Sequence, residues 1–188
     1  MKILVLDNYD SFTYNLVYII RDLGYGAQMD IFRNDKISLD EVENYDKILL
    51  SPGPGVPEDA GIMLALLKRY SPTKDIFGVC LGHQAIGEAF GSGLINLTEV
   101  VHGVASKVKI QPDPVFAGIP ETFTVGRYHS WVIDESTLPE CLEVIAKTPD
   151  GQIMAVRHTA FKVRGVQFHP ESILTEHGVR MVQNWLEG

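Results

Sequence analysis

Two short segments of this sequence carry the residue types of nucleophilic catalysis. Gly78-Val79-Cys80-Leu81-Gly82 has the Gly-x-nucleophile-x-Gly form of a sharp turn that lifts a reactive side chain above a sheet. His169-Pro170-Glu171 offers an imidazole to activate a thiol and a carboxylate to orient the ring. Cys80 alone could be a packed cysteine at a strand end, and the His-Pro-Glu triplet alone is weak evidence. Together, they predict Cys80 as nucleophile, His169 as its base and as acid for the leaving group, and Glu171 as the orienting carboxylate.

A proline- and glycine-rich segment, Ser51–Pro57, offers backbone groups for the same chemistry. Its prolines fix φ and its glycines permit close approach, so the loop could anchor a carboxylate or complete an oxyanion hole. The N–H of Leu81, directly after the nucleophile, would be free to donate to the same oxyanion. An ordinary turn is the plainer interpretation of Ser51–Pro57. It is not a phosphate-binding P-loop, because it lacks the Gly-Lys-Ser/Thr ending.

Alternating strand and helix patterns in the first half would position these segments. Ser11 is the expected N-cap of a helix over Phe12–Leu23, and Gly24 stands where a terminating glycine belongs. Further helices are expected over Ala60–Tyr70 and His83–Phe90. Four buried strands are expected over Lys2–Leu6, Ala27–Phe32, Lys47–Leu50 and Ile76–Val79. This alternation is typical of a parallel sheet with helices on both faces.

The second half predicts a different arrangement, in which short strands are separated by Pro, Gly and Asp and followed by a helix over Val179–Leu186. The expected strands are Val104–Ile110, Phe123–Val125, Cys141–Thr148, Ile153–Arg157 and Val163–Phe168. We therefore expect one α/β domain over residues 1–188, an open, mostly parallel sheet with helices on both faces and an added smaller antiparallel sheet. Ligands of open parallel sheets bind beyond the carboxyl ends of the strands. Four loops should converge there: Asp7–Thr13, Ser51–Pro57, Cys80–Gln84 and His169–Ser172.

Length and composition exclude several classes of protein. A chain of 188 residues with 45% hydrophobic residues is about one globular domain. Its 16 basic and 24 acidic residues give a net charge of −8 without a basic cluster, so no nucleic-acid partner is expected. No apolar run approaches the roughly 20 residues that span a bilayer. The first residues lack a signal-peptide pattern, so we expect a cytoplasmic protein with Cys80 and Cys141 reduced. The six histidines have no metal-ligand spacing, and no metal site is expected.

Five segments, in order along nearly the whole chain, resemble the class I glutamine amidotransferases, which use a Cys-His-Glu triad. They are Asp7-Asn8-Tyr9-Asp10-Ser11-Phe12-Thr13, Ser51-Pro52-Gly53-Pro54-Gly55, Gly78-Val79-Cys80-Leu81-Gly82-His83-Gln84, Arg127-Tyr128-His129-Ser130 and His169-Pro170-Glu171-Ser172. The first and fourth segments are similar to those of the glutaminase subunits of chorismate-using synthases, which form anthranilate or aminodeoxychorismate. Two departures are Trp131, where a smaller apolar residue is common, and the absence of a Lys after Gly103.

The resemblance implies a role for each residue of the site. Cys80, His169 and Glu171 would form the catalytic triad, with the N–H groups of Gly53 and Leu81 as the oxyanion hole. The residues implied to bind L-glutamine are Gly53, Pro54, Gly55, the side chain of Gln84, and the backbone of Ser130 and Trp131. The implied reaction is hydrolysis of the glutamine side-chain amide through a glutamyl thioester on Cys80.

Released ammonia creates a need for a partner. In neutral water ammonia is mostly protonated and no longer nucleophilic, so it requires a shielded route to the molecule that it aminates. The resemblance supplies that partner as a chorismate-aminating synthase subunit, and implies Mg²⁺ only there and no cofactor in this chain. We expect Asp7–Thr13 and the loop His102–Ser106 to lie near the rim that faces the partner.

Two other functions stay open on the residues alone. A flavodoxin-like fold could serve as a non-catalytic binding module for a flavin or phosphate. The triad could also belong to a stand-alone Cys hydrolase of γ-glutamyl substrates with no synthase partner. Replacing Cys80 with Ser would leave a binding module intact but abolish glutamine hydrolysis. Either chorismate-derived product is permitted, because the partner's active site chooses the position that is aminated.

Overall fold

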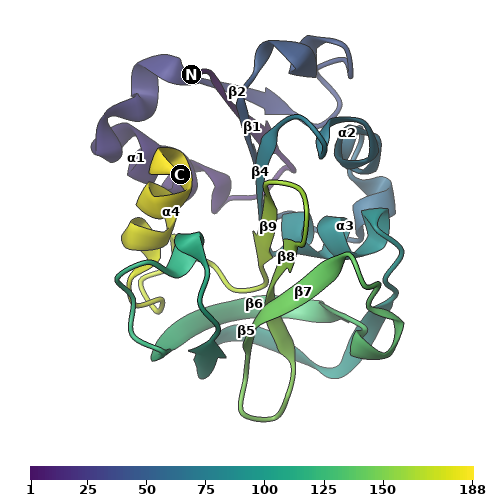
Figure 1. Ribbon diagram of the computed structural model, residues 1–188, viewed down its shortest axis with the longest axis vertical. Coiled ribbons are helices and arrows are strands. Elements are labelled where there is room, and N and C mark those ends of the chain that lie inside the picture. The colour runs from purple at the N-terminus through teal and green to yellow at the C-terminus, as the bar shows by residue number, and fades with distance from the viewer.

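One nine-stranded sheet organises the molecule, and the computed structural model describes all residues from 1 to 188 (Figure 1). Its parallel part consists of β1 (Ile3–Asp7), β2 (Met29–Arg33), β3 (Lys47–Leu50), β4 (Asp75–Val79) and β9 (Val163–Val166). Its antiparallel part consists of β8 (Ile153–His158), β7 (Leu142–Lys147), β5 (Leu94–Ile110) and β6 (Thr122–Ile133). The strand order is β2-β1-β3-β4-β9-β8-β7-β5-β6. The predicted fold class is confirmed, and the antiparallel strands continue the parallel sheet rather than forming a sheet apart.

Helices cover both faces of the parallel part, as predicted. In Figure 1, α1 (Thr13–Ile20) and α4 (Gly178–Glu187) lie on one side, while α2 (Met63–Tyr70) and α3 (Leu81–Ala89) lie on the other. The side chains of β1 show why both faces are covered, because alternate residues enter two separate hydrophobic cores. Ile3 and Val5 face α1 and α4. Leu4 and Leu6 face α2 and α3. Short helical turns complete the fold: η1 (Arg21–Tyr25), η2 (Gly26–Gln28), η3 (Glu41–Asn44), η4 (Pro57–Asp59), η5 (Pro114–Phe116) and η6 (Glu135–Thr137).

The first helix differs from its prediction at both ends. Ser11 makes no capping hydrogen bond, and Phe12 is the N-cap residue. Instead Asp10 accepts a hydrogen bond from the N–H of Phe12 at 2.7 Å. The α-helix ends at Ile20 and continues as the π-helical turn η1, in which Gly24 has the left-handed φ of 91° expected of a helix-ending glycine.

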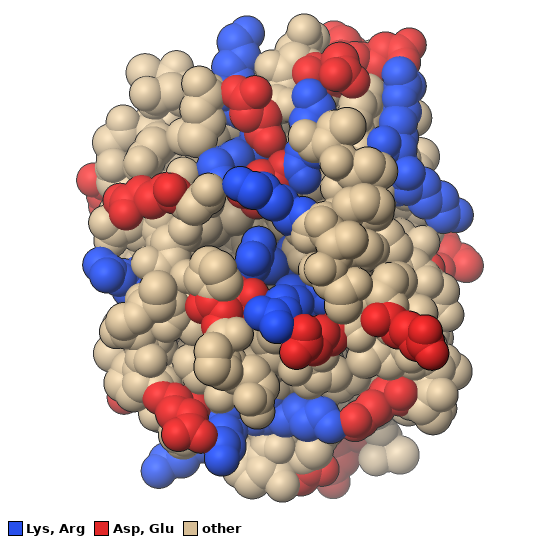
Figure 2. All heavy atoms as spheres, in the orientation of Figure 1, with Lys and Arg blue, Asp and Glu red and all other residues tan.

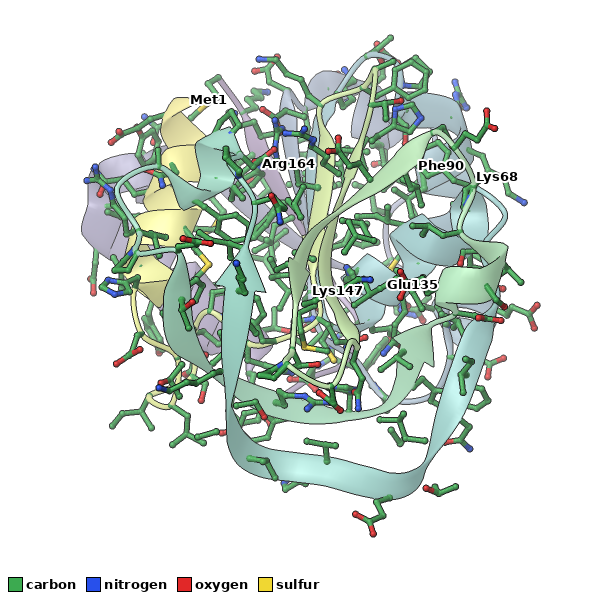
Figure 3. All side chains as sticks on the ribbon, turned by 60° about the horizontal axis from the view of Figure 1, so that its bottom comes forward. Met1, Lys68, Phe90, Glu135, Lys147 and Arg164 are labelled. Carbon is green, nitrogen blue, oxygen red and sulfur yellow. The ribbon has the colours of Figure 1, made fainter.

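The strands β5 and β6 are far longer than predicted and form a ribbon across the lower part of Figure 1. The predicted loop His102–Ser106 lies within β5 and not in a loop, although the register shifts between His102 and Val104. The prediction stopped short because much of β5 is exposed and lacks an apolar alternation. Hydrogen bonding to β6 holds these residues of β5 in strand conformation. The view in Figure 3 turns this ribbon toward the reader. Two labelled residues in that view, Lys147 of β7 and Glu135 of η6, form an ion pair.

Charged side chains of both signs are interspersed on the face seen in Figure 2.

Asp113 is a carboxylate whose side chain is fully buried. It accepts hydrogen bonds from Arg164 at 2.7 Å and from Arg157 at 3.2 Å. No helix has the length and apolarity required to cross a membrane. No group of three His, Cys, Asp or Glu side chains has the arrangement of a metal site.

Candidate active site

Cys80 lies at the sharp bend between β4 and α3. Its φ of 53° and ψ of −99° are unusual for a residue with a side chain, and such a conformation costs of order 1–3 kcal/mol. The flanking glycines are sterically required. A Cβ on Gly78 would lie 2.6 Å from the carbonyl carbon of Gly82, and a Cβ on Gly82 would lie 2.5 Å from the carbonyl oxygen of Leu50. The bend places the sulfur at the N-terminus of α3, where the helix dipole stabilises a thiolate.

His169 reaches the same rim because β9 is the neighbour of β4. Val79 pairs with Val166, and the N–H of Cys80 donates to the carbonyl of Val166 at 2.8 Å. His169 Nδ1 and Glu171 Oε1 are 2.6 Å apart, and both side chains are almost completely buried. With Nδ1 held by the carboxylate, Nε2 has no hydrogen-bond partner and remains free for the thiol.

The charge state of His169 suits this arrangement. Burial alone would lower its pKa, but the side chains of Cys80 and Glu171 outweigh burial and raise the pKa to about 10. Cys80 and Glu171 therefore favour the protonated ring, whose positive charge would stabilise a neighbouring thiolate. This is the charge pattern that a thiol nucleophile with a proton donor beside it requires.

Aromatic rings cover His169 on the side of the rim. The rings of Phe12 and Tyr128 lie 5.4 Å and 5.0 Å from the His169 ring, centroid to centroid, and His102 lies edge-on to Tyr128 at 5.4 Å. The hydroxyl groups of Tyr128 and Ser172 are 3.0 Å apart. The segments Asp7–Thr13 and His102–Ser106 thus both reach the rim of the candidate site.

A pocket of about 200 Å³ opens beside Cys80. It is smaller than the roughly 300–1,000 Å³ of sites for drug-sized ligands, and suits a single amino acid. The predicted residues that line it are Gly53, Pro54, Gly55, Cys80, Gln84, Ser130 and Trp131. Residues that sequence reasoning did not assign to the glutamine pocket also line it: Val100, Val101, His102, Tyr128 and His129.

The two predicted oxyanion donors lie beside each other. A Cβ on Gly53 would be 2.7 Å from Leu81 Cδ2 and 2.6 Å from the Cβ of Asn8, so only glycine lets the loop approach α3 this closely. The N–H groups of Gly53 and Leu81 donate no backbone hydrogen bond in the chain, because one lies in a loop and the other in the first turn of α3. Both are available to an oxyanion.

Gln84 is held so that only its oxygen can meet a ligand. Its Nε2 donates to the carbonyl of Trp131 at 2.9 Å and to Oε1 of Gln167 at 3.3 Å. Gln167 was missed by sequence reasoning, although a polar residue two positions before His169 is a visible signal. It is fully buried and its Nε2 lies 3.6 Å from Cys80 Sγ.

Two further histidines near the site are buried and neutral. Burial lowers the pKa of His83 to about 3 and outweighs a backbone contact with Gly165 that raises it. Burial, followed by the charge of Arg127, lowers the pKa of His129 to about 3. Cys141 is partly buried, far along the sequence from the site, and both cysteines are free thiols.

Comparison with known proteins gives consistent matches. Residues 4–188 match the family described as glutamine amidotransferase class-I. The chain is 47% identical to anthranilate synthase component 2 of Pseudomonas aeruginosa, over 98% of this chain and 94% of that protein. It is 43% identical to aminodeoxychorismate/anthranilate synthase component 2 of Bacillus subtilis, over 98% of this chain and 95% of that protein. The crystal structure of a putative GMP synthase protein from Thermoplasma acidophilum matches with a TM-score of 0.87 at 27% identity, covering 100% of this chain and 92% of that chain.

Proposed function

The chain belongs to the class-I glutamine amidotransferase family, and we propose that it is the glutaminase subunit of a chorismate-aminating synthase. One observation carries the proposal. A cysteine at a strained strand-to-helix bend shares a rim with an imidazole whose far nitrogen is held by a carboxylate at 2.6 Å. The pocket beside the sulfur has room for one amino acid.

The first step is attack of the Cys80 thiolate on the side-chain amide carbon of L-glutamine. The carbonyl oxygen becomes an oxyanion, which accepts hydrogen bonds from the N–H groups of Gly53 and Leu81. Gln84 Oε1 and the backbone of Ser130 and Trp131 hold the amino-acid part of the substrate, together with the loop from Gly53 to Gly55.

The second step expels ammonia. His169 Nε2 gives its proton to the amide nitrogen as the C–N bond breaks, which leaves a glutamyl thioester on Cys80 and a neutral imidazole. His169 then takes a proton from water, whose oxygen attacks the thioester carbonyl. Glutamate leaves, and the thiolate–imidazolium pair is restored. Glu171 keeps Nδ1 protonated and stabilises the charged ring throughout.

A partner subunit would receive the ammonia, as the names of the two curated relatives suggest. The rim around the site offers two exposed side chains that such a partner could cover. Val100 is 74% exposed and Tyr9 46% exposed. Every group used in the hydrolysis is a side chain or backbone group of this chain, so we propose no cofactor here and assign Mg²⁺ to the chorismate-binding partner.

The replacement Cys80→Ser tests this function. With the partner present, we expect glutamine-dependent formation of anthranilate or aminodeoxychorismate from chorismate to fall by about 10³-fold or more. Product formation from added ammonium should persist, because the partner's site is untouched. Cys141→Ser is the matched control and should keep glutamine-dependent activity. Retained activity in Cys80→Ser, or loss of activity in Cys141→Ser alone, would contradict the assignment.

A further inference from the structure

A continuous chain of hydrogen bonds among largely buried groups runs from Arg127 on β6 to the sulfur of Cys80. Arg127 Nε donates to His129 Nε2 at 3.1 Å, and His129 Nδ1 lies 3.0 Å from the carbonyl oxygen of Trp131. The same carbonyl accepts from Gln84 Nε2 at 2.9 Å. Gln84 also donates to Gln167 Oε1 at 3.3 Å, and Gln167 Nε2 lies 3.6 Å from Cys80 Sγ.

Two groups set the direction of the hydrogen bonds in this chain: the guanidinium of Arg127, which can only donate, and the carbonyl of Trp131, which can only accept. A guanidinium can only donate, so Nε2 of His129 must accept and Nδ1 must carry the proton. A backbone carbonyl can only accept, so the atom of Gln84 that faces Trp131 must be the amide nitrogen. The second hydrogen of that nitrogen then requires the oxygen of Gln167 to face it, which turns the Gln167 nitrogen toward the sulfur.

We propose that Gln167 is a further catalytic residue, whose N–H donates to the Cys80 thiolate and holds the sulfur in position for attack. The inference rests on the proposed function of Cys80 as the nucleophile. Hydrogen bonds to an ionised acceptor are about twice as strong as those between neutral groups, and this one is buried, since Gln167 is 0% exposed. His169 and Gln167 both lie in the segment directly after β9, and together they offer the thiolate two donors.

Arg127 supports a directional role for the chain. It is 6% exposed, and Asp150 acts on its charge from a distance without a direct contact. Its hydrogen-bond partners are the neutral side chains of His129, Ser106 and Gln152. A buried guanidinium whose direct hydrogen bonds all go to neutral groups gains less from charge than one in a direct ion pair. What it does contribute is the tautomer of His129, while the carbonyl of Trp131 sets the orientation of Gln84 and Gln167.

The test compares Gln167→Met and Gln167→Glu in a Cys141→Ser background, where iodoacetamide can modify only Cys80. Met keeps the chain length without the donor, and Glu places a carboxylate oxygen against the sulfur. We expect alkylation at neutral pH to slow by about 10-fold or more in Gln167→Met and further in Gln167→Glu. The kcat for glutamine should fall in parallel, with KM little changed. Gln183→Met, on the exposed side of α4, is the matched control and should alkylate like the parent.

A purely structural role for Gln167 would move the alkylation rate the other way, because a loosened site exposes Cys80 and speeds its modification. The comparison uses variants that keep the urea-unfolding midpoint of the parent. If Cys80 in such a variant is alkylated as fast as in the parent, the proposal is overturned. The alkylation assay needs no glutamine. A parent chain that fails to hydrolyse glutamine would refute the proposed function, while the alkylation comparison still decides the role of Gln167.

Discussion

The pKa of His169 indicates that Cys80 and His169 act as a catalytic pair rather than as two unrelated polar side chains. A buried imidazole without partners loses its proton, as His83 does with a pKa of about 3. The pKa of His169 moves in the opposite direction, to about 10, because Cys80 and Glu171 outweigh its burial. Two histidines in similarly buried surroundings thus differ by the presence of an acidic partner.

The replacement Glu171→Gln tests the contribution of that partner. The amide keeps the size of the side chain but removes the negative charge that stabilises the imidazolium. We expect kcat for glutamine hydrolysis to fall by about 10²-fold or more, in line with the loss of an orienting carboxylate in other triads. Steady-state kinetics measures the effect, and Glu187→Gln at the C-terminal end of α4 is the matched control. Wild-type kcat in Glu171→Gln would show that the carboxylate has no catalytic role.

At the residue scale, the sequence could predict the groups that react but not those that orient them. Cys80, His169 and Glu171 stand in patterns whose chemistry is visible in the residue types. Gln167 and His129 belong to the same buried chain of hydrogen bonds. His129 bonds to Arg127 and Trp131 of its own strand, whereas Gln167 bonds to Gln84, which lies on α3 and far away in the sequence. The position of Gln167 two residues before His169 is visible in the sequence, but its contact with Gln84 is not.

The bend between β4 and α3 is the element that converts the sequence into a reactive geometry. Its two glycines remove side chains where the backbone of the helix start lies against β3 and against β4 itself. The strained backbone of Cys80 persists because these contacts hold both sides of the turn.

The replacement Gly82→Ala should disrupt this element. The added methyl would lie 2.5 Å from the Leu50 carbonyl oxygen, and backbone atoms cannot yield as a flexible side chain can. We expect a loss of about 1–3 kcal/mol in the free energy of unfolding, together with loss of glutaminase activity. Gly26→Ala is the control, since its methyl would meet the flexible side chain of Arg21 at 3.1 Å. Urea denaturation that finds both variants equally stable would contradict the account.

At the element scale, the parallel strands were predictable and the antiparallel ribbon was not. Strands β1, β3 and β4 are buried on both faces and therefore appear as unbroken apolar runs. Strands β5 and β6 owe their length to each other, and their exposed middle portions carry no apolar alternation. That ribbon also supplies Val100, Val101 and His129 to the pocket, which explains why these residues were missed.

The whole molecule places its reactive groups at the carboxyl ends of the parallel strands, between two cores that meet only through the sheet. This arrangement buries histidines on both sides of the site. Their protonation makes the free energy of unfolding depend on pH. The dependence from His169, whose pKa is raised, is opposite in sign to that from His83 and His129, whose pKa values are lowered.

We expect the free energy of unfolding to fall as pH drops below about 6.5. His83 and His129 have folded-state pKa values of about 3 against an ordinary value of 6.5, so the unfolded chain binds protons that the fold excludes. Each contributes a loss of about 2 kcal/mol by pH 5. The raised pKa of His169 acts in the opposite sense, because its stabilisation is fully present below about pH 6.5 and is lost as pH rises from there through about 10.

Urea denaturation at pH 7 and pH 5 measures the acid effect, with His83→Leu as the diagnostic variant. Leu removes the titrating ring from a fully buried position and leaves an apolar side chain there, so it should weaken the pH dependence of the free energy of unfolding. An undiminished fall between pH 7 and pH 5 in His83→Leu would show that this histidine is not the buried neutral group described.

The central claim, that Cys80 is the nucleophile toward glutamine, is tested most directly by labelling the protein with a chloroketone analogue of L-glutamine and mapping the adduct by mass spectrometry. The account predicts one adduct per chain, on the peptide that contains Cys80, with protection by L-glutamine and no adduct in Cys80→Ser. An adduct on Cys141, or labelling of Cys80 that L-glutamine does not slow, would contradict it.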